Sequence, residues 1–212
     1  MPAFPNPESR NVLEPGCARC PALLEARERI SWGNGPLDAE VVVVGEAPGA
    51  GDPDADRWQG GNWTGMAYTS RHSGRLIREL LSDVGFGPER CYYTNAVKCF
   101  PSDDAGSNRE PTSEELETCR THLVREIREI DPRVVISTGR HATDTIFAVE
   151  GWTLEGFLEL VLEPIDLNQL GTTLLPILHP SYQAVWRSRL GYTAAEYRDA
   201  LKEALKPQQE GV

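Results

Sequence analysis

Short apolar runs alternate with helical stretches along most of the chain. The apolar runs are continuous, as in strands buried on both faces of a parallel sheet, and they lie at 40–44, 92–95, 133–138 and 172–178. Apolar residues recur every three or four positions in the helical stretches, which lie at 74–85, 114–130, 139–149 and 194–205. The alternation predicts an α/β fold, a three-layer α/β/α sandwich with a mainly parallel four-stranded central sheet.

Polar residues stand where three of these strands end. Glu46 follows the first strand, Asn95 ends the second and His179 follows the fourth. Ligands of open α/β sheets bind beyond the carboxyl ends of the strands. We therefore expect the loops after the first, second and fourth strands to converge on one site, whereas 151–168 gives no clear pattern.

The length fits one domain over 1–212, with 1–35 as a lead-in. At 212 residues and 40% hydrophobic, the chain can bury one good core. No apolar run is long enough to span a bilayer and the first residues lack a signal core, so we expect a soluble cytoplasmic protein without a membrane partner. The net charge of -11 argues against non-specific binding of nucleic acid over a broad surface, but it permits a local basic patch.

Four of the five cysteines form a set that suits a metal. An odd number of cysteines argues against a disulfide framework. Cys17-x2-Cys20, Cys99 and Cys119 offer four thiols with one close pair, and their spacing leaves zinc, a [4Fe-4S] cluster and unrelated buried thiols open. Cys91 precedes the second strand and is interpreted as a core or spare cysteine.

The loop after the first strand holds several candidates. Gly45 and Gly49 allow close approach of the backbone to a ligand, and Glu46 and Asp52 supply carboxylates. A solvated loop is the ordinary explanation for either acid alone. Tyr68 offers an aromatic face to a base, or else packs on the core.

Other candidates also have ordinary explanations. Asn95 is an amide that can read a donor-acceptor pair on a ligand, or a turn residue. His179 in "HPS" is an electrophile or a structural histidine. Ser73 at a helix start can meet a phosphate or simply cap the helix. His122 and His141 are predicted to be surface helix residues.

Taken in order, the motifs resemble one family. They are the CxxC, "GEAPG", "TNAVKC", "PTSEELETCRTHLVREI" with "PRVVISTGRHA", and "HPS". Together they resemble the iron-sulfur uracil-DNA glycosylases of families 4 and 5 over about 17–205. "GEAPG" is similar to family 4, whereas "GGNWTGMAYTSRHSG" and "PTSEELETCR" are closer to family 5.

The resemblance implies a cofactor and a reaction. It implies that the four cysteines Cys17, Cys20, Cys99 and Cys119 hold a structural [4Fe-4S] cluster. It also implies that the enzyme flips deoxyuridine out of DNA and hydrolyses its glycosidic bond, leaving an abasic site.

It further implies roles for individual residues. Asn95 would bond the uracil edge, Tyr68, where the family has Phe, would stack on the base, and His179 would stabilise charge on the departing uracil O2. Gly45 and Ala47 are expected to border the base. For the assisting carboxylate, Asp52 is the first choice and Glu46 the second. The expected DNA contacts are Ser73, Ser181, Tyr182 and Arg187, in or near a wedging loop.

The predicted function is a monomeric, monofunctional glycosylase that acts on uracil-containing DNA, single- or double-stranded, without lyase chemistry. The main alternative is a catalytically silent iron-sulfur DNA-binding protein on the same fold. A second alternative is a zinc-stapled nucleotide-binding α/β protein.

Overall fold

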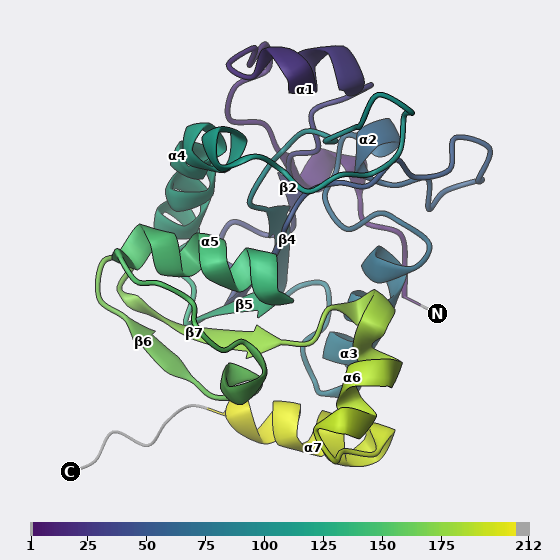
Figure 1. Ribbon diagram of the computed structural model, residues 1–212. Helices are drawn as coiled ribbons and strands as arrows, with labels where there is room; N and C mark the ends of the chain where they lie inside the picture. Colours follow the sequence, from purple (N-terminus) through teal and green to yellow (C-terminus); the bar gives the residue numbers. More distant parts are fainter. Residues whose placement is uncertain (1, 207–212) are drawn as a thin grey trace.

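Four parallel strands form the middle of the sheet in the computed structural model, which describes residues 2–206. They are β3 (Val41–Gly45), β4 (Cys91–Asn95), β5 (Val134–Thr138) and β7 (Thr172–Ile177). β3 pairs in parallel with β4 and β5, and β5 pairs in parallel with β7. The four predicted strands and their parallel direction are thus confirmed, and all four carboxyl ends lie at one edge (Figure 1).

The sheet is wider than predicted. Within the described chain it has seven strands, in the order β1-β2-β4-β3-β5-β7-β6. β1 (Arg10–Asn11) and β2 (Gly33–Asn34) extend it antiparallel beyond β4, and β6 (Ile165–Leu167) pairs antiparallel with β7. The expectation of four strands was wrong because strands of two or three residues are too short to carry a period in hydrophobicity.

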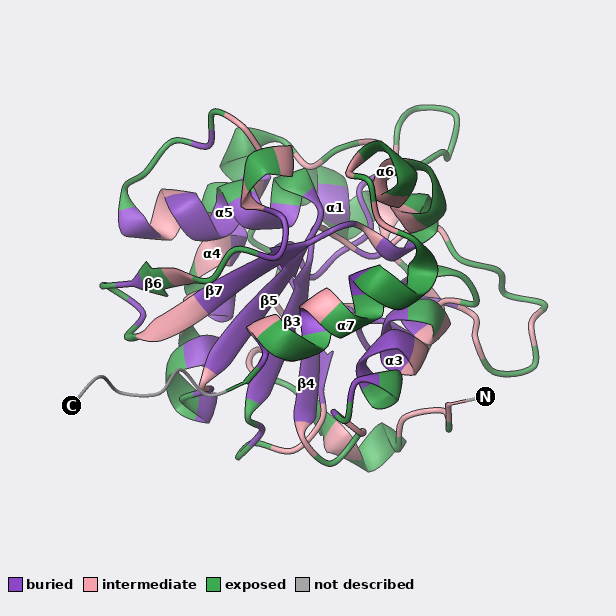
Figure 2. Ribbon diagram, turned by 90° about the horizontal axis from the view of Figure 1, so that it is seen from below, coloured by how far each residue is buried: buried purple, intermediate pink, exposed green. Residues whose placement is uncertain are grey.

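Helices cover both faces of the sheet. α3 (Ser73–Asp83) and α7 (Ala194–Ala204) pack on one face, and α4 (Ser113–Ile130) and α5 (Arg140–Glu150) pack on the other. Alternate residues of β3 serve the two cores: Val41 and Val43 belong to the first, Val42 and Val44 to the second. Figure 2 shows the buried strands between helices whose outer faces are exposed.

Shorter elements complete the described chain. They are α1 (Pro21–Ala26), α2 (Gly61–Thr64) and α6 (Gln183–Arg189), with 3-10 helices η1 (Pro7–Ser9), η2 (Leu158–Leu160) and η3 (Pro180–Tyr182). α6 was not predicted, since it has seven residues and none of them is buried. Between residues 2 and 206, none of the helices combines the length and the apolar character needed to cross a membrane.

The start of α4 is fixed by side chains. Thr112 accepts a hydrogen bond from the Glu115 backbone N–H, and the Glu115 carboxylate accepts one from the Thr112 backbone N–H at 2.8 Å, forming a capping box. Arg109 donates to both oxygens of Glu115, at 2.8 and 2.6 Å. The loop before α4 is therefore tied to the helix.

Candidate active site and cysteine cavity

A cavity of about 940 Å³ opens where the parallel strands end. Gly45, Asn95 and His179 line it, so the loops after the first, second and fourth parallel strands converge as expected. The loop after β5 also contributes, through Thr138 and the residues that follow it. Since β5 lies between β3 and β7, its carboxyl end must share that edge of the sheet, and the sequence prediction omitted it.

The floor of the cavity is built around Gly45. Gly45 and Asn95 are partners in the β3–β4 register. A Cβ atom at Gly45 would stand 2.5 Å from Asn95 Oδ1 and 2.6 Å from Tyr68 Oη. Any side chain here would collide with both, so glycine is what allows an amide and a phenol from distant segments to meet.

Tyr68 lines one side of the cavity, and its side chain is held in place. Its backbone has φ +53°, an uncommon conformation for a residue other than glycine. Its side chain is buried, and its hydroxyl lies 2.6 Å from Thr138 Oγ1 in a hydrogen bond. Burial raises the pKa of Tyr68, so the hydroxyl stays neutral. Thr138 was not predicted, because only the fold brings it to Tyr68.

The Asn95 side chain combines burial with a free amide. Asn95 is 5% exposed and lines the cavity, yet no hydrogen bond joins its side-chain amide to another residue of 2–206. The amide atoms are not among the fully enclosed polar atoms without a partner, so they face the open cavity. The position therefore suits a ligand that supplies both an acceptor and a donor.

His179 reaches the cavity as a neutral imidazole. Its Nδ1 accepts a hydrogen bond from the Ser181 backbone N–H at 3.3 Å, and burial lowers the pKa of His179. With Nδ1 accepting, the proton of the neutral ring is on Nε2. His179 can thus donate a hydrogen bond to a ligand near pH 7.

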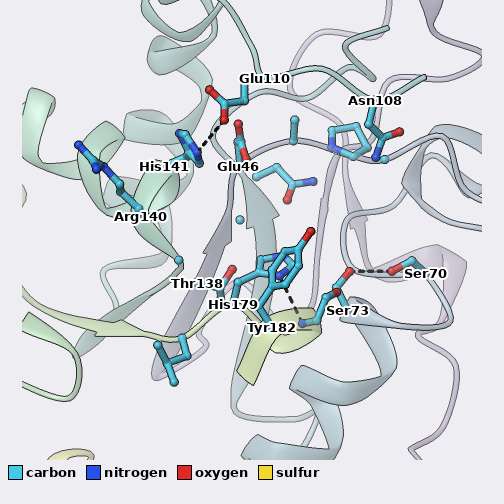
Figure 3. A pocket seen from close by; sticks show the side chains of 18 of the residues that line it. Glu46, Ser70, Ser73, Asn108, Glu110, Thr138, Arg140, His141, His179 and Tyr182 are labelled. Carbon is cyan, nitrogen blue, oxygen red and sulfur yellow. Dashed lines mark hydrogen bonds and ion pairs between the residues drawn. The ribbon is translucent and has the colours of Figure 1, made fainter. Parts of the chain in front are cut away.

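A carboxylate cluster occupies another part of the cavity. Burial is the main cause that raises the pKa of Glu46; the charge of Glu110 adds to the rise and His141 opposes it. Glu110 and His141 are paired at 3.2 Å. Figure 3 shows these three side chains grouped apart from His179 and Tyr182. His141 is exposed as predicted, but it also lines the cavity.

Asp52 and Arg187 are not among the cavity-lining residues. Asp52 is exposed, and its carboxylate accepts a hydrogen bond from the Asp54 backbone N–H at 3.1 Å within the loop. Gly51, with φ +75°, turns this loop so that the Asp52 N–H donates to the Gln59 carbonyl. The loop thereby folds on itself, so distance in sequence from Gly49 did not predict where the carboxylate would lie.

The remaining predicted residues lie along the cavity. Ala47, Ser73, Ser181 and Tyr182 all line it. The Ser73 hydroxyl is 2.8 Å from that of Ser70 (Figure 3). Tyr182 is 63% exposed. The cavity therefore has a buried end at Asn95 and an exposed aromatic side chain at its edge.

The four predicted metal cysteines line a second, small cavity. It is bordered by Cys17, Cys20, Cys99 and Cys119, together with Arg27, Lys98 and His122. Cys91 is buried separately, with its Sγ 3.7 Å from the Phe86 carbonyl. His122 was predicted to be a surface residue, and this was wrong: it is buried against Cys17, with Nε2 to Sγ 3.7 Å.

N–H groups point at these sulfurs. Arg27 Nη1 donates to Cys99 Sγ at 3.0 Å, and the Lys98 backbone N–H donates to Cys119 Sγ at 3.3 Å. Burial raises the pKa of Cys119 to about 12, so binding of a metal there must displace a proton. Four thiols, two of which accept hydrogen bonds from N–H donors, suit a thiolate-ligated metal or cluster, whose charge such hydrogen bonds stabilise.

Comparison with known proteins gives consistent matches. A family model described as "Uracil DNA glycosylase superfamily" matches residues 32–206. A type-4 uracil-DNA glycosylase of Thermotoga maritima is 36% identical over 166 residues, 78% of this chain and 77% of that protein. One of Archaeoglobus fulgidus is 38% identical over 131 residues (62% and 58%). One of Saccharolobus solfataricus is 29% identical over 192 residues (89% and 82%).

Proposed function

The chain belongs to the uracil-DNA glycosylase superfamily, and from this membership we propose that it hydrolyses the N-glycosidic bond of deoxyuridine in DNA. The observation that carries the proposal is the meeting of Asn95, Tyr68 and His179 in one cavity beyond the strand ends. The enzyme leaves an abasic site and performs no lyase chemistry.

The base is read by Asn95 and Tyr68. A nucleotide inside the duplex is out of reach, so the uridine must first be flipped into the cavity. The free Asn95 amide bonds the donor and acceptor of the uracil edge, and the Tyr68 ring packs against its face. Gly45 and Ala47 leave room for the base between them.

His179 stabilises the leaving group. As the glycosidic bond breaks, negative charge collects on the uracil O2. The Nε2–H of a neutral His179 donates a hydrogen bond to that oxygen, and a preorganised donor in a site with little water stabilises such charge strongly. Its orientation is set by the Ser181 N–H that occupies Nδ1.

We assign the assisting carboxylate to Glu46 and not to Asp52. Glu46 lines the cavity next to Gly45, whereas Asp52 is exposed in its loop. An ionised Glu46 stabilises the cationic sugar or orients the attacking water, as carboxylates do in glycoside hydrolysis. Its raised pKa makes this role sensitive to pH.

The edge of the cavity contacts DNA. The exposed Tyr182 is well placed to fill the gap left by the flipped base, and Ser73 and Ser181 donate hydrogen bonds to phosphates beside the cavity. Arg187 on α6 adds a positive charge behind this edge. We further propose that the enzyme acts as a monomer and that it works in the cytoplasm, where its DNA substrate would lie.

We assign the four-cysteine cavity to a [4Fe-4S] cluster. Cys17, Cys20, Cys99 and Cys119 would be its ligands, and Arg27 would bond one of the sulfurs. Bound there, a cluster would join the lead-in, the loop after β4 and α4, and its role would be structural. No step of the reaction passes through it.

Excision of uracil from an oligonucleotide tests the proposed function. The labelled strand, alone and opposite guanine, is incubated with the protein at low and high salt and then treated with alkali. Alkali-dependent cleavage at uracil is expected, and cleavage without alkali would contradict a monofunctional enzyme. An unchanged strand in every condition would support the silent DNA-binding alternative.

A further inference from the structure

A buried ion pair lies beneath the strand end that carries Asn95. Lys98 Nζ and Glu126 Oε2 are 2.5 Å apart, and the two side chains are 1% and 0% exposed. Lys98 Nζ also donates to Thr94 Oγ1 and to the Asn95 backbone carbonyl, each at 2.6 Å. All three N–H donors of the ammonium group are therefore used.

Glu126 is equally well satisfied. It accepts hydrogen bonds from the Tyr92 hydroxyl at 2.8 Å and the Thr94 hydroxyl at 2.7 Å, in addition to Lys98. Tyr92 and Thr94 belong to β4, and Glu126 belongs to α4. The ion pair and its hydrogen bonds thus link the last residues of β4 to α4.

The same lysine also reaches the cysteine cavity. Its backbone N–H donates to Cys119 Sγ, and its residue lines that cavity but not the base cavity. Cys119 lies on α4, like Glu126. Lys98 therefore connects the Asn95 segment to two residues of α4, Glu126 and Cys119.

Stability alone does not explain this arrangement. Two buried charges are costly to desolvate, and well-packed neutral side chains in their place are often as stable or more so. What a satisfied ion pair provides is a fixed geometry. Here that geometry is imposed on the carbonyl of Asn95, at the point where the strand ladder ends.

We propose that Lys98 and Glu126 are positioning residues for Asn95, which hold the uracil-reading amide in place without touching the base. The inference rests on the proposed function. A displaced Asn95 would still lie in the cavity but would bond the transition state poorly. Misplacement of a reacting geometry by about 1 Å can cost on the order of 100-fold in rate.

The test replaces both charges at once, in Lys98→Met/Glu126→Gln, measured on the iron-loaded protein. We expect iron content and Tm close to those of the wild type, with single-turnover excision of uracil lowered about 100-fold. Adding Asn95→Ala to this variant should cause no further loss beyond that of Asn95→Ala alone, because all three changes act on one contact.

A matched control uses the ion pair at the other end of β4. Arg90 donates to Glu40 at 2.8 and 2.7 Å, just before the strand begins. Arg90→Met/Glu40→Gln should keep wild-type rates. If the Lys98 variant does not fold, Thr94→Val, which removes one hydroxyl from the network, should lower the rate and be non-additive with Asn95→Ala.

The possible results separate the two claims. Two results would overturn the positioning role alone, provided that the wild-type protein excises uracil. The first is an unchanged excision rate in Lys98→Met/Glu126→Gln. The second is an excision rate in the triple variant that is lower than that of Asn95→Ala by the full factor that Lys98→Met/Glu126→Gln causes by itself. A wild-type protein that leaves uracil in place contradicts the proposed function, and the positioning role with it.

Discussion

At the scale of single residues, the Gly45 position decides whether the cavity can exist. Replacing Gly45 with alanine would place a methyl group 2.5 Å from Asn95 Oδ1 and 2.6 Å from Tyr68 Oη. Overpacking of this kind costs about 1–3 kcal/mol, and it would move both side chains that we propose to contact the base. We predict that kcat/KM on uracil-containing DNA falls about tenfold or more.

Gly16→Ala is the control for that change. Within residues 2–206, no atom lies within 4 Å of a Cβ atom at Gly16, so the same substitution should leave kcat/KM and Tm unchanged there. Equal activity in the two variants would show that the contact around Gly45 does not matter for binding the base.

The second residue-scale prediction concerns pH. Burial chiefly raises the pKa of Glu46 above 4.5, Glu110 raises it further and His141 lowers it. In the proposed mechanism the ionised Glu46 carboxylate is the active form, so kcat/KM should fall as the pH drops through this raised pKa. Glu110→Gln removes a negative charge that raises the pKa of Glu46, so the fall of kcat/KM on the acid side of the pH profile (the acid limb) should move to lower pH. His141→Gln should move the acid limb to higher pH.

A pH profile of kcat/KM for the three proteins checks this. Opposite shifts of the acid limb identify Glu46 as the group that titrates. If the acid limb lies at the same pH in the wild type and in both variants, a group other than Glu46 causes it.

The positions of the cavity residues were partly predictable from sequence. Asn95 and His179 end or follow apolar strands, and such positions share one edge in a parallel sheet, where both line the cavity. The position of Asp52 outside the cavity lining was not predictable, because a loop folded by its own backbone hydrogen bonds carries no periodic signal. Thr138 and the Glu110–His141 pair depend on contacts between distant segments, which one sequence does not reveal.

At the scale of elements, the capping box of α4 should contribute measurably to stability. Thr112→Ala removes the side-chain acceptor for the Glu115 N–H. Loss of such a cap costs about 1 kcal/mol, which corresponds to a fall in Tm of about 2–4 °C for a chain of this size. Thermal unfolding measured by circular dichroism checks the value.

Thr193→Ala is the matched variant in α7, which has a capping box of the same kind with Glu196. A similar fall in Tm is expected, because both boxes make the same two bonds. A stable Thr112→Ala protein beside a destabilised Thr193→Ala protein would mean that Arg109 and the backbone N–H of residue 112 hold Glu115 in place without the Thr112 hydroxyl.

The elements that the sequence predicted are those long enough to show a period. β3, β4, β5 and β7 are continuous apolar runs, and α3, α4, α5 and α7 bury an apolar stripe. β1, β2 and β6 have two or three residues each, and their pairing is decided by neighbours far along the chain. Local pattern therefore predicted the core of the sheet but not its edges.

At the scale of the whole molecule, the cysteine cavity should govern stability. Its four cysteines come from the lead-in, the loop after β4 and α4, so a cluster bound by them would close long loops between these segments. We predict that the purified protein is brown and holds iron. Removal of the iron by a chelator should bleach the visible absorbance and lower Tm.

Metal analysis with thermal unfolding checks this prediction. Cys91→Ser is the control, because Cys91 lies apart from the cavity and should not affect iron content. A colourless protein with stoichiometric zinc, or a Tm that does not change when the metal is removed, would contradict the cluster.

The central claim is that the Asn95 amide reads uracil, and single-turnover excision by Asn95→Ala tests it most directly. Asn6→Ala, at an exposed cap far along the chain, is the control. The wild type and the control should release uracil at equal rates, and Asn95→Ala should be slower by about 100-fold or more. Wild-type excision by Asn95→Ala would contradict the assignment.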